Sequence, residues 1–312
     1  MTFDLAKLSG HPSLHRVVSE VLAVWPEHES YCESRFRDDP PGFVQRSDDL
    51  ANLVLRLVGP ELRTYCADYR WMCEAFVAEE YYFRSEGRYR LSTFKEAYEQ
   101  IYSNAEYMTK YVRGILISQF IWSPHALAFD YFRTHFLPGN QSGARHLEVG
   151  PGHGLGLYFA AQDPRIATLE AWDVSESSIA ATRHALTKLG VTRPVNLVEQ
   201  DVLAAPARED AFDSAIISEV LEHLERPDLA LATLRRALRP GGRIFINVPV
   251  NSPAPDHIYL WTSHEAFVDW VQSHGFEIES TRFLPVTGAT LERAVKRKLS
   301  ISCVVVAKRP LP

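Results

Sequence analysis

Hydrophobic residues up to about position 137 recur at intervals of three and four, which is the spacing of one face of an α-helix. The periodicity predicts helices that begin near Leu14 and Leu50, and helices over residues 61–84, 94–102 and 107–122. Ser47 is the expected N-cap of the second helix and Gly59 its stop. No segment of this half has the pattern of a strand, so residues 1–143 are predicted to form an all-helical domain.

The pattern changes after the proline and glycine breakers of residues 138–143. Helical stretches separate the first five of seven apolar runs, an order that predicts an α/β domain over residues 144–312 with a parallel, doubly wound sheet. The last two strands are joined by a longer excursion and are expected to end as an antiparallel pair. The expected strands cover residues 146–149, 169–173, 195–200, 213–218, 243–248, 276–283 and 300–307.

Composition and net charge indicate a folded globular protein and argue against some partners. The 312 residues are 46% hydrophobic and 23% charged, which is typical of packed domains. The net charge of −6 argues against nucleic acid as a partner, and the basic run at residues 293–298 fits a solvated helix face. The four cysteines show no CxxC pair, which argues against zinc and a disulfide framework, and Cys66 and Cys73 are typical of helix core.

The compartment follows from the same observations. The first residues lack the apolar stretch of a signal peptide, and no apolar run approaches the roughly 20 residues that a membrane span needs. A protein without a disulfide framework suits a reducing compartment. The sequence therefore predicts a cytoplasmic protein with no membrane partner.

The clearest chemical signal is HLEVGPGHGLG at residues 146–156, where an apolar strand leads into a glycine loop and then a helix. The carboxyl edge of the sheet at such a crossover is the expected ligand crevice. The dinucleotide fingerprint requires a glycine or alanine where this chain has Leu155. Glycines instead alternate from Gly150 to Gly154, and Glu148 places an acid on the strand itself, which favours a cationic ligand over a pyrophosphate. The alternative is a glycine-rich turn without a ligand.

This segment resembles motif I of the class I S-adenosylmethionine (SAM)-dependent methyltransferases. Four further landmarks stand in that family's order: AWDVS at 171–175, EQDV at 199–202, FDSAIISEVLEHL at 212–224 and LRPGGR at 238–243. The resemblance covers residues 144 to about 308, and it implies a Rossmann-like, seven-stranded, SAM-binding domain. It also implies the cofactor-binding residues: Glu148, Gly150, Pro151 and Gly152 for the methionine part, Asp173 and Val174 for the ribose, Asp201 and Val202 for the adenine, and Ser218 and Glu219 beneath the sulfonium.

The segment from Glu219 to His223, with His257 further along, resembles the ubiquinone-type O-methyltransferases and a small-RNA 2′-O-methyltransferase group. In the RNA group such acids and histidines bind a divalent ion, and Glu219, Glu222, His223 and His257 offer suitable ligands. The alternative is that Glu222 and His223 pack locally and Glu219 lines the cofactor crevice. We favour this second interpretation and predict no metal, and the acidic pI argues against RNA.

Two segments supply candidate catalytic residues. Asp256 and His257 follow the fifth strand, and a histidine there is a reasonable general base, although the loop could equally be a lid. On the helix over 107–122, one stripe holds Tyr107, Tyr111, Gly114, Ser118 and Trp122, which is expected to be a pocket wall whose aromatic rings face the sulfonium. The alternative for the stripe is helix–helix packing.

We therefore expect a SAM-dependent methyltransferase of specialised metabolism that methylates a small molecule at nitrogen or oxygen, with His257 or a tyrosine removing the acceptor's proton. A second possibility is resemblance to the azetidine-2-carboxylic acid synthases, SAM cyclases in which the substrate's own amine attacks its γ-carbon and methylthioadenosine leaves. A third is a non-catalytic SAM-binding subunit. SAM is the expected methyl or aminopropyl-type donor, and the sequence makes no prediction of the oligomeric state.

Overall fold

The computed structural model describes residues 4–37, 39–205 and 208–312, so the first three residues of the N-terminal segment lie outside the described residues. The chain divides into two compact units. The first holds Met1–Asp130 together with two later segments, Ser252–His257 and Leu284–Ser300. The second holds Tyr131–Asn251, Ile258–Phe283 and Ile301–Pro312, so the expected boundary between residues 143 and 144 falls inside it.

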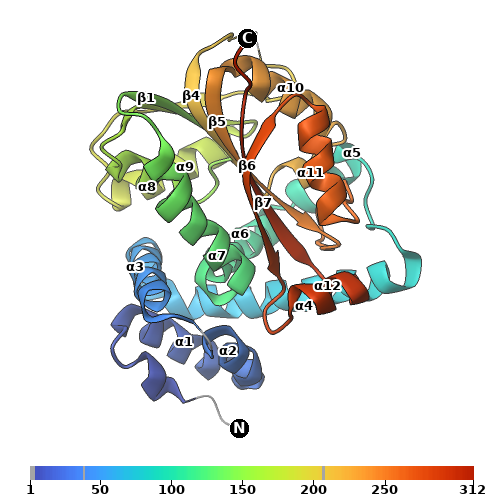
Figure 1. Cartoon of the computed structure of the whole chain (residues 1–312). Coiled ribbons are helices and arrows are strands. Elements are labelled where there is room, and N and C mark those ends of the chain that lie inside the picture. The colour runs from blue at the N-terminus through green and yellow to red at the C-terminus, as the bar shows by residue number, and fades with distance from the viewer. Residues whose placement is uncertain (1–3, 38, 206–207) are drawn as a thin grey trace. The chain divides into compact units, whose positions relative to one another are not determined.

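The first unit is helical, as the periodicity predicts. Its main elements are α1 (Pro12–Val24), α2 (Glu29–Phe36), α3 (Pro41–Val58), α4 (Leu62–Glu86), α5 (Phe94–Ala97), the π-helix η4 (Tyr98–Tyr102), α6 (Ala105–Ile121) and α12 (Leu291–Arg297) (Figure 1). Gly59 ends α3 with a positive φ of 59°, which confirms the predicted stop. The predicted N-cap is wrong: α3 begins at Pro41, because proline suits the first turn, and Ser47 is buried within the helix.

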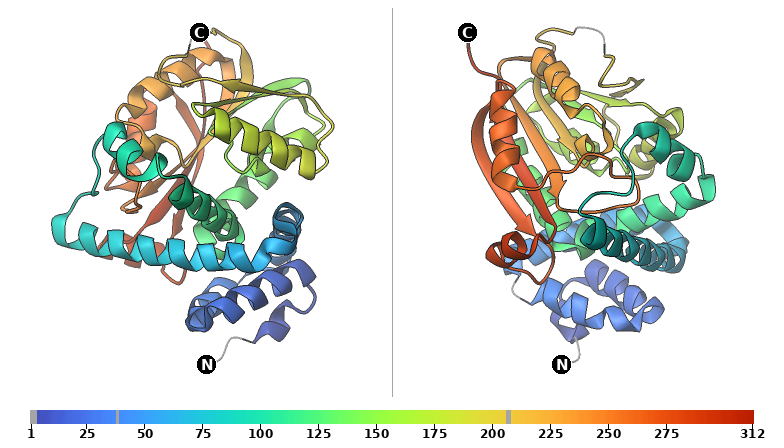
Figure 2. Two further views of the ribbon diagram at one scale, coloured as in Figure 1. Left: turned by 180° about the vertical axis from the view of Figure 1, so that it is seen from behind. Right: turned by 90° about the vertical axis from the view of Figure 1, so that its right-hand side faces the viewer.

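Helices α4 and α6 lie side by side, and the stripe on α6 that was expected to line a pocket is part of their contact (Figure 2). A Cβ at Gly114 would lie 2.8 Å from the Cβ of Met72, so this glycine admits α4 instead of a ligand. Tyr107 packs edge-on against Trp71 and Tyr111 stacks on Phe76, both on α4. Helix–helix packing, the alternative for this stripe, therefore accounts for it.

The second unit contains a seven-stranded sheet in the order β3-β2-β1-β4-β5-β7-β6, which confirms the predicted number of strands (Figure 1). The neighbouring strands β3, β2, β1, β4 and β5 pair in parallel, and β7 runs antiparallel to β5. The strands are β1 (Ala144–Val149), β2 (Ile166–Asp173), β3 (Val195–Glu199), β4 (Phe212–Ser218), β5 (Leu238–Val250), β6 (Glu277–Pro285) and β7 (Ile301–Lys308). Strands β1, β4, β5 and β7 are almost wholly buried, as expected for the centre of a covered sheet.

The helices that pack on this sheet include α8 (Leu155–Gln162), α9 (Glu176–Lys188), α10 (Pro227–Ala237) and α11 (His264–Ser273). Each of the first three follows a strand and buries its apolar side, which is the arrangement that the alternating pattern predicts. All four cysteines are buried and free, and Cys66 and Cys73 lie in the core as expected. No helix in the described ranges is both long and apolar enough to cross a membrane.

Candidate functional site

The glycine loop, residues 150–154, connects the carboxyl end of β1 to α8. Gly150, Gly152 and Gly154 have φ values of 68°, 48° and 74°, which other residues rarely adopt. A Cβ at Gly150 would also lie 2.6 Å from Cγ2 of Val220, so there is no room for a side chain. The Thr182 hydroxyl on α9 donates to the carbonyl of Gly152 at 2.7 Å. The alternating glycines are therefore required by the backbone path of the loop.

Glu148 on β1 is a buried acid with an unsatisfied oxygen. Its side chain is 6% exposed, and Oε2 has no hydrogen-bond partner among the residues that the structure describes. A Cβ at Gly156 would lie 2.5 Å from Oε1, so the start of α8 passes directly over the carboxyl group. Burial raises the pKa of Glu148 to about 8. A buried carboxyl group with an unpaired oxygen calls for a cationic or hydrogen-bond-donating ligand.

The acids predicted to bind ribose and adenine lie on adjacent loops. The amide of Gln200, at the end of β3, donates to the carbonyl of Asp173, at the end of β2, at 2.8 Å. The Asp173 carboxylate accepts from the Ser175 amide at 3.0 Å and from the Ser178 hydroxyl at 2.7 Å, and burial raises its pKa. Asp201 accepts from the Leu203 amide at 2.8 Å. Val174 is 57% exposed and Val202 is 4% exposed.

Strand register brings the remaining cofactor candidates to the same edge of the sheet. Val149, which precedes the glycine loop, pairs with Trp172 on β2 and with Ile217 on β4. Because neighbouring parallel strands end together, the residues that follow them meet at one edge. Glu148, Gly150, Pro151, Gly152, Asp173, Val174, Asp201, Val202, Ser218 and Glu219 are all at or directly beyond these strand ends.

Glu219 follows β4 in an uncommon backbone conformation. Its φ is 53°, in the left-handed region that glycine favours. Its amide donates to the carbonyl of Asn247 at 2.9 Å, and its Oε1 accepts from Nδ2 of Asn247 at 2.7 Å. Burial raises the pKa of Glu219 to about 8. A strained, partly buried acid at the ligand end of a sheet is typical of a functional position.

Asp256, a catalytic candidate, belongs to the first unit, where two tyrosines hold its carboxylate. The Tyr111 hydroxyl donates to Oδ1 at 2.8 Å and the Tyr102 hydroxyl to Oδ2 at 3.3 Å. The Ser252 amide, in the same segment, donates to the Tyr89 hydroxyl at 3.2 Å. These contacts bind the segment Ser252–His257 to the helices of its own unit.

His257 lies in the same segment, and its ring orientation suits a base. Its Nδ1 lies 2.7 Å from the carbonyl oxygen of Ser252. A carbonyl only accepts, so Nδ1 carries the proton in this pair, and Nε2 of the neutral ring is the basic nitrogen. The Tyr89 ring packs edge-on against the imidazole at 5.7 Å between centroids.

Tyr107 and Tyr111, the other catalytic candidates, are poorly suited to remove a proton. Burial, together with the nearby charge of Asp256, raises the pKa of Tyr107 to about 12. Burial and Asp256 raise the pKa of Tyr111 well above the usual value. Both hydroxyls therefore stay protonated near neutral pH, where they can donate hydrogen bonds, and this disfavours a tyrosine as the base.

Residues 147–246 match the family model described as a methyltransferase domain. The matched range contains the glycine loop, Asp173, Asp201 and Glu219, in the order and geometry given above. This chain contains a class I SAM-dependent methyltransferase domain. SAM is the cofactor of this family, and the sequence resemblance is confirmed at the level of the superfamily.

Relatives of the methyltransferase domain include enzymes named ubiquinone/menaquinone biosynthesis C-methyltransferase UbiE. The one from Pasteurella multocida is 32% identical over 123 residues, which is 36% of this chain and 46% of the relative. The one from Cupriavidus metallidurans is 30% identical over 105 residues, which is 33% of this chain and 42% of the relative. The chain therefore spans less than half the length of these relatives.

Solved structures also resemble this chain. The [4+2]-cyclase SpnF has a TM-score of 0.49 and 20% identity, and covers 60% of this chain and 80% of its own. A SAM-dependent methyltransferase from Mesorhizobium loti has a TM-score of 0.43 and 19% identity, and covers 54% of this chain and 92% of its own. Similarity of this degree says nothing about the reaction.

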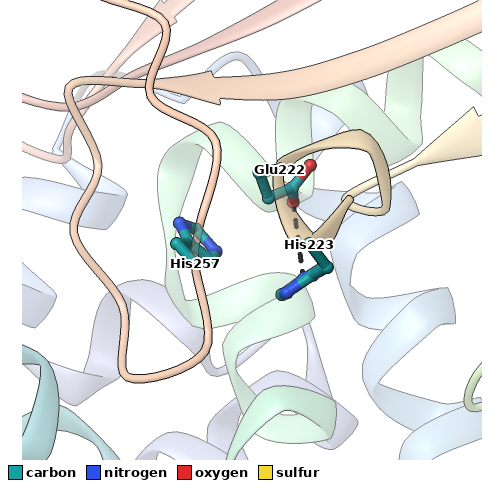
Figure 3. Close-up of side chains that lie close together, drawn as sticks. All are labelled: Glu222, His223 and His257. Atoms are coloured by element: carbon teal, nitrogen blue, oxygen red, sulfur yellow. Dashed lines mark ion pairs between the residues drawn. The ribbon is translucent and has the colours of Figure 1, made fainter. Parts of the chain in front are cut away.

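The methyltransferase domain also contains Glu222 and His223, which were considered as metal ligands. Both lie on the 3-10 helix η7 (Leu221–His223), where Nε2 of His223 is 3.8 Å from Oε1 of the fully buried Glu222 (Figure 3). The carbonyl of Glu222 accepts from the amides of Ile258 and Tyr259 at 3.0 and 2.9 Å. His257, also drawn in Figure 3, belongs to the other unit. These contacts account for the backbone of Glu222 and leave the choice between local packing and metal binding a prediction.

Sequence reasoning missed several residues that the structure places at the methyltransferase site or in the Asp256 segment. Asn247 binds Glu219, Thr182 binds the glycine loop, and Tyr102 and Tyr89 bind the segment that carries Asp256. A buried asparagine in the apolar run of β5 was the one visible signal, since buried strands rarely carry an amide without a partner.

Proposed function

We propose that this protein is a SAM-dependent methyltransferase that acts on a small molecule at nitrogen or oxygen. The observation that carries the proposal is the buried carboxyl group of Glu148, whose Oε2 is unpaired among the described residues and lies at the end of the strand that feeds the glycine loop. SAM brings a cationic amino group, which fits such an oxygen. The match of residues 147–246 to the methyltransferase family supports the same conclusion.

The residues at the strand ends fit the other parts of SAM. We assign the methionine part to Glu148, Gly150, Pro151 and Gly152, the ribose to Asp173 with Val174 beside it, and the adenine to Asp201 and Val202. Two carboxylates on adjacent loops suit the vicinal ribose hydroxyls and the adenine amino group, because both are hydrogen-bond donors. We assign Ser218 and Glu219 to the sulfonium.

Bound SAM supplies an electrophilic methyl group for in-line displacement, so the protein mainly aligns the acceptor and excludes water. We propose that Nε2 of His257 removes the proton of the acceptor, because Nδ1 is hydrogen-bonded to the Ser252 carbonyl. Asp256 fixes Tyr102 and Tyr111, and these residues hold the segment that carries His257. We propose that the helical residues 1–143 serve acceptor binding.

The surroundings of the reaction belong to the same proposal. Four buried, free cysteines are compatible with a reducing cytoplasm, and the net charge of −6 supports a small molecule over nucleic acid as partner. Specialised metabolism is the proposed setting.

The test is to incubate the purified protein with SAM, first alone and then with panels of phenols, amines and activated aromatic carbons, and to identify the products by mass spectrometry. We expect S-adenosylhomocysteine and a methylated phenol or amine, formed only when an acceptor is present. Methylthioadenosine and azetidine-2-carboxylic acid from SAM alone would replace the proposal by SAM cyclisation. A carbon-methylated product would overturn the assignment to nitrogen or oxygen, and tight binding without turnover would indicate a non-catalytic subunit.

A further inference from the structure

Asn247 on β5 holds Glu219 at two points. Its carbonyl accepts from the Glu219 amide at 2.9 Å, and its Nδ2 donates to Oε1 of Glu219 at 2.7 Å and to the Ser218 hydroxyl at 3.2 Å. The left-handed backbone of Glu219 costs about 1 kcal/mol or more, so it persists only where its surroundings fix it. Asn247 supplies that restraint for both the backbone and the carboxylate.

Ser302 on β7 orients the amide of Asn247. Its hydroxyl donates to Oδ1 of Asn247 at 2.7 Å, and the two side chains are 5% and 2% exposed. The amide turns its Nδ2 donor toward the Glu219 carboxyl group, so its Oδ1 faces Ser302, whose hydroxyl donates to it. A chain of three side chains from β7, β5 and the end of β4 therefore sets the direction of one carboxylate.

We propose that Asn247, oriented by Ser302, is a positioning residue that aims the Glu219 carboxylate at the sulfonium of SAM. This inference rests on the proposed function, because it needs SAM at the strand ends. Neither Asn247 nor Ser302 is a catalytic residue, since each acts through Glu219. A purely structural role would tie the three strands together without any preference for a charged ligand.

The charge of the sulfonium separates these two roles. SAM carries that charge and S-adenosylhomocysteine does not, so an aimed carboxylate favours SAM while general damage to the site weakens both ligands. Calorimetric titration of the full chain with each ligand, at a pH above the Glu219 pKa of about 8 so that its carboxylate is ionised, gives the ratio of the two dissociation constants. Ser302→Val and Ser302→Thr form a matched pair, because they have the same shape and only threonine keeps the hydroxyl.

We expect Ser302→Val to weaken SAM binding about fivefold and Asn247→Leu about tenfold, as for loss of a hydrogen bond to a charged group, with little change for S-adenosylhomocysteine. Ser302→Thr should bind both ligands like the wild type. In a Glu219→Gln background, Ser302→Val should have no further effect on SAM binding, because the carboxylate charge is already absent.

Equal weakening of both ligands, or the same effect of Ser302→Val with and without the Glu219 carboxylate, would overturn the positioning role and leave the proposed function intact. A wild-type chain that binds neither ligand would overturn the proposed function and this inference with it. Melting temperatures of all variants identify those that fail to fold, and Asn247→Leu retains the test if valine is not tolerated at position 302.

Discussion

Replacing Glu148 by glutamine should remove part of the pH dependence of folding. Burial raises the pKa of Glu148 to about 8 from its ordinary value of 4.5, so the folded protein keeps a proton that the unfolded chain has lost. Between these two values stability falls as pH rises, because the unfolded state binds fewer protons. Integrated from about pH 7 to about pH 8, where the folded state also begins to ionise, the loss is about 1 kcal/mol. Glutamine has nearly the same shape and no charge in either state.

Other buried groups set the background for this measurement. Burial also raises the pKa of Glu219 to about 8, so the wild type should lose about 2 kcal/mol over this interval and Glu148→Gln about 1 kcal/mol. Burial lowers the pKa values of His28, His146 and His153 to about 4. These histidines make the free energy of unfolding rise with pH, which is opposite to the effect of the two glutamates. Their effect falls mainly below about pH 7, where the unfolded histidines still bind protons.

The assay is urea denaturation at the two pH values, followed by tryptophan fluorescence and by circular dichroism to test whether both units unfold together. Glu209→Gln, which changes an exposed glutamate of the same domain, should keep the wild-type dependence. If Glu148→Gln loses as much stability as the wild type between the two pH values, Glu148 is not protonated in the folded state and the account of its burial is wrong.

Three further substitutions test individual contacts. Gly156→Ala should weaken SAM binding by about tenfold or more in calorimetry, because the new methyl group meets Oε1 of Glu148 at 2.5 Å; unchanged affinity would contradict this packing. Gly114→Ala should lower the free energy of unfolding in urea by about 1–2 kcal/mol, because the new Cβ lies 2.8 Å from Met72. This loss outweighs the gain of about 1 kcal/mol in helix propensity. A more stable variant would contradict helix packing at Gly114 and favour the pocket-wall interpretation of the stripe. Once an acceptor is known, His257→Gln should lower kcat by about 100-fold or more and leave the dissociation constant of SAM unchanged, and an unaltered kcat would exclude His257 as base.

The alternating strands and the glycine loop could be predicted because their determinants are local. The apolar runs, the breakers between them and the glycines at Gly150, Gly152 and Gly154 are all visible within short windows of sequence. The positions of Asp173 and Asp201 followed, since parallel strands end at the same edge of the sheet. That edge then brought their loops together, with Gln200 bonded to the Asp173 carbonyl.

Contacts between distant segments could not be predicted in the same way. Ser302 is 55 residues from Asn247, and Tyr111 is 145 residues from Asp256, so no local pattern indicates either hydrogen bond. The stripe on α6 failed for a different reason. Small and aromatic residues at helical spacing suit both a ligand and a neighbouring helix, and only the position of Met72 decides between them at Gly114. Ser47 likewise satisfied the N-cap pattern, but Pro41 begins the helix earlier.

The most direct test of the central claim is a crystal structure of the full chain with S-adenosylhomocysteine. We predict that the nucleoside lies over the ends of β2 and β3 near Asp173 and Asp201, that the amino group lies beside Glu148, and that the sulfur faces Ser218 and Glu219. Binding elsewhere, or an amino group directed away from Glu148, would contradict the assignment of this site.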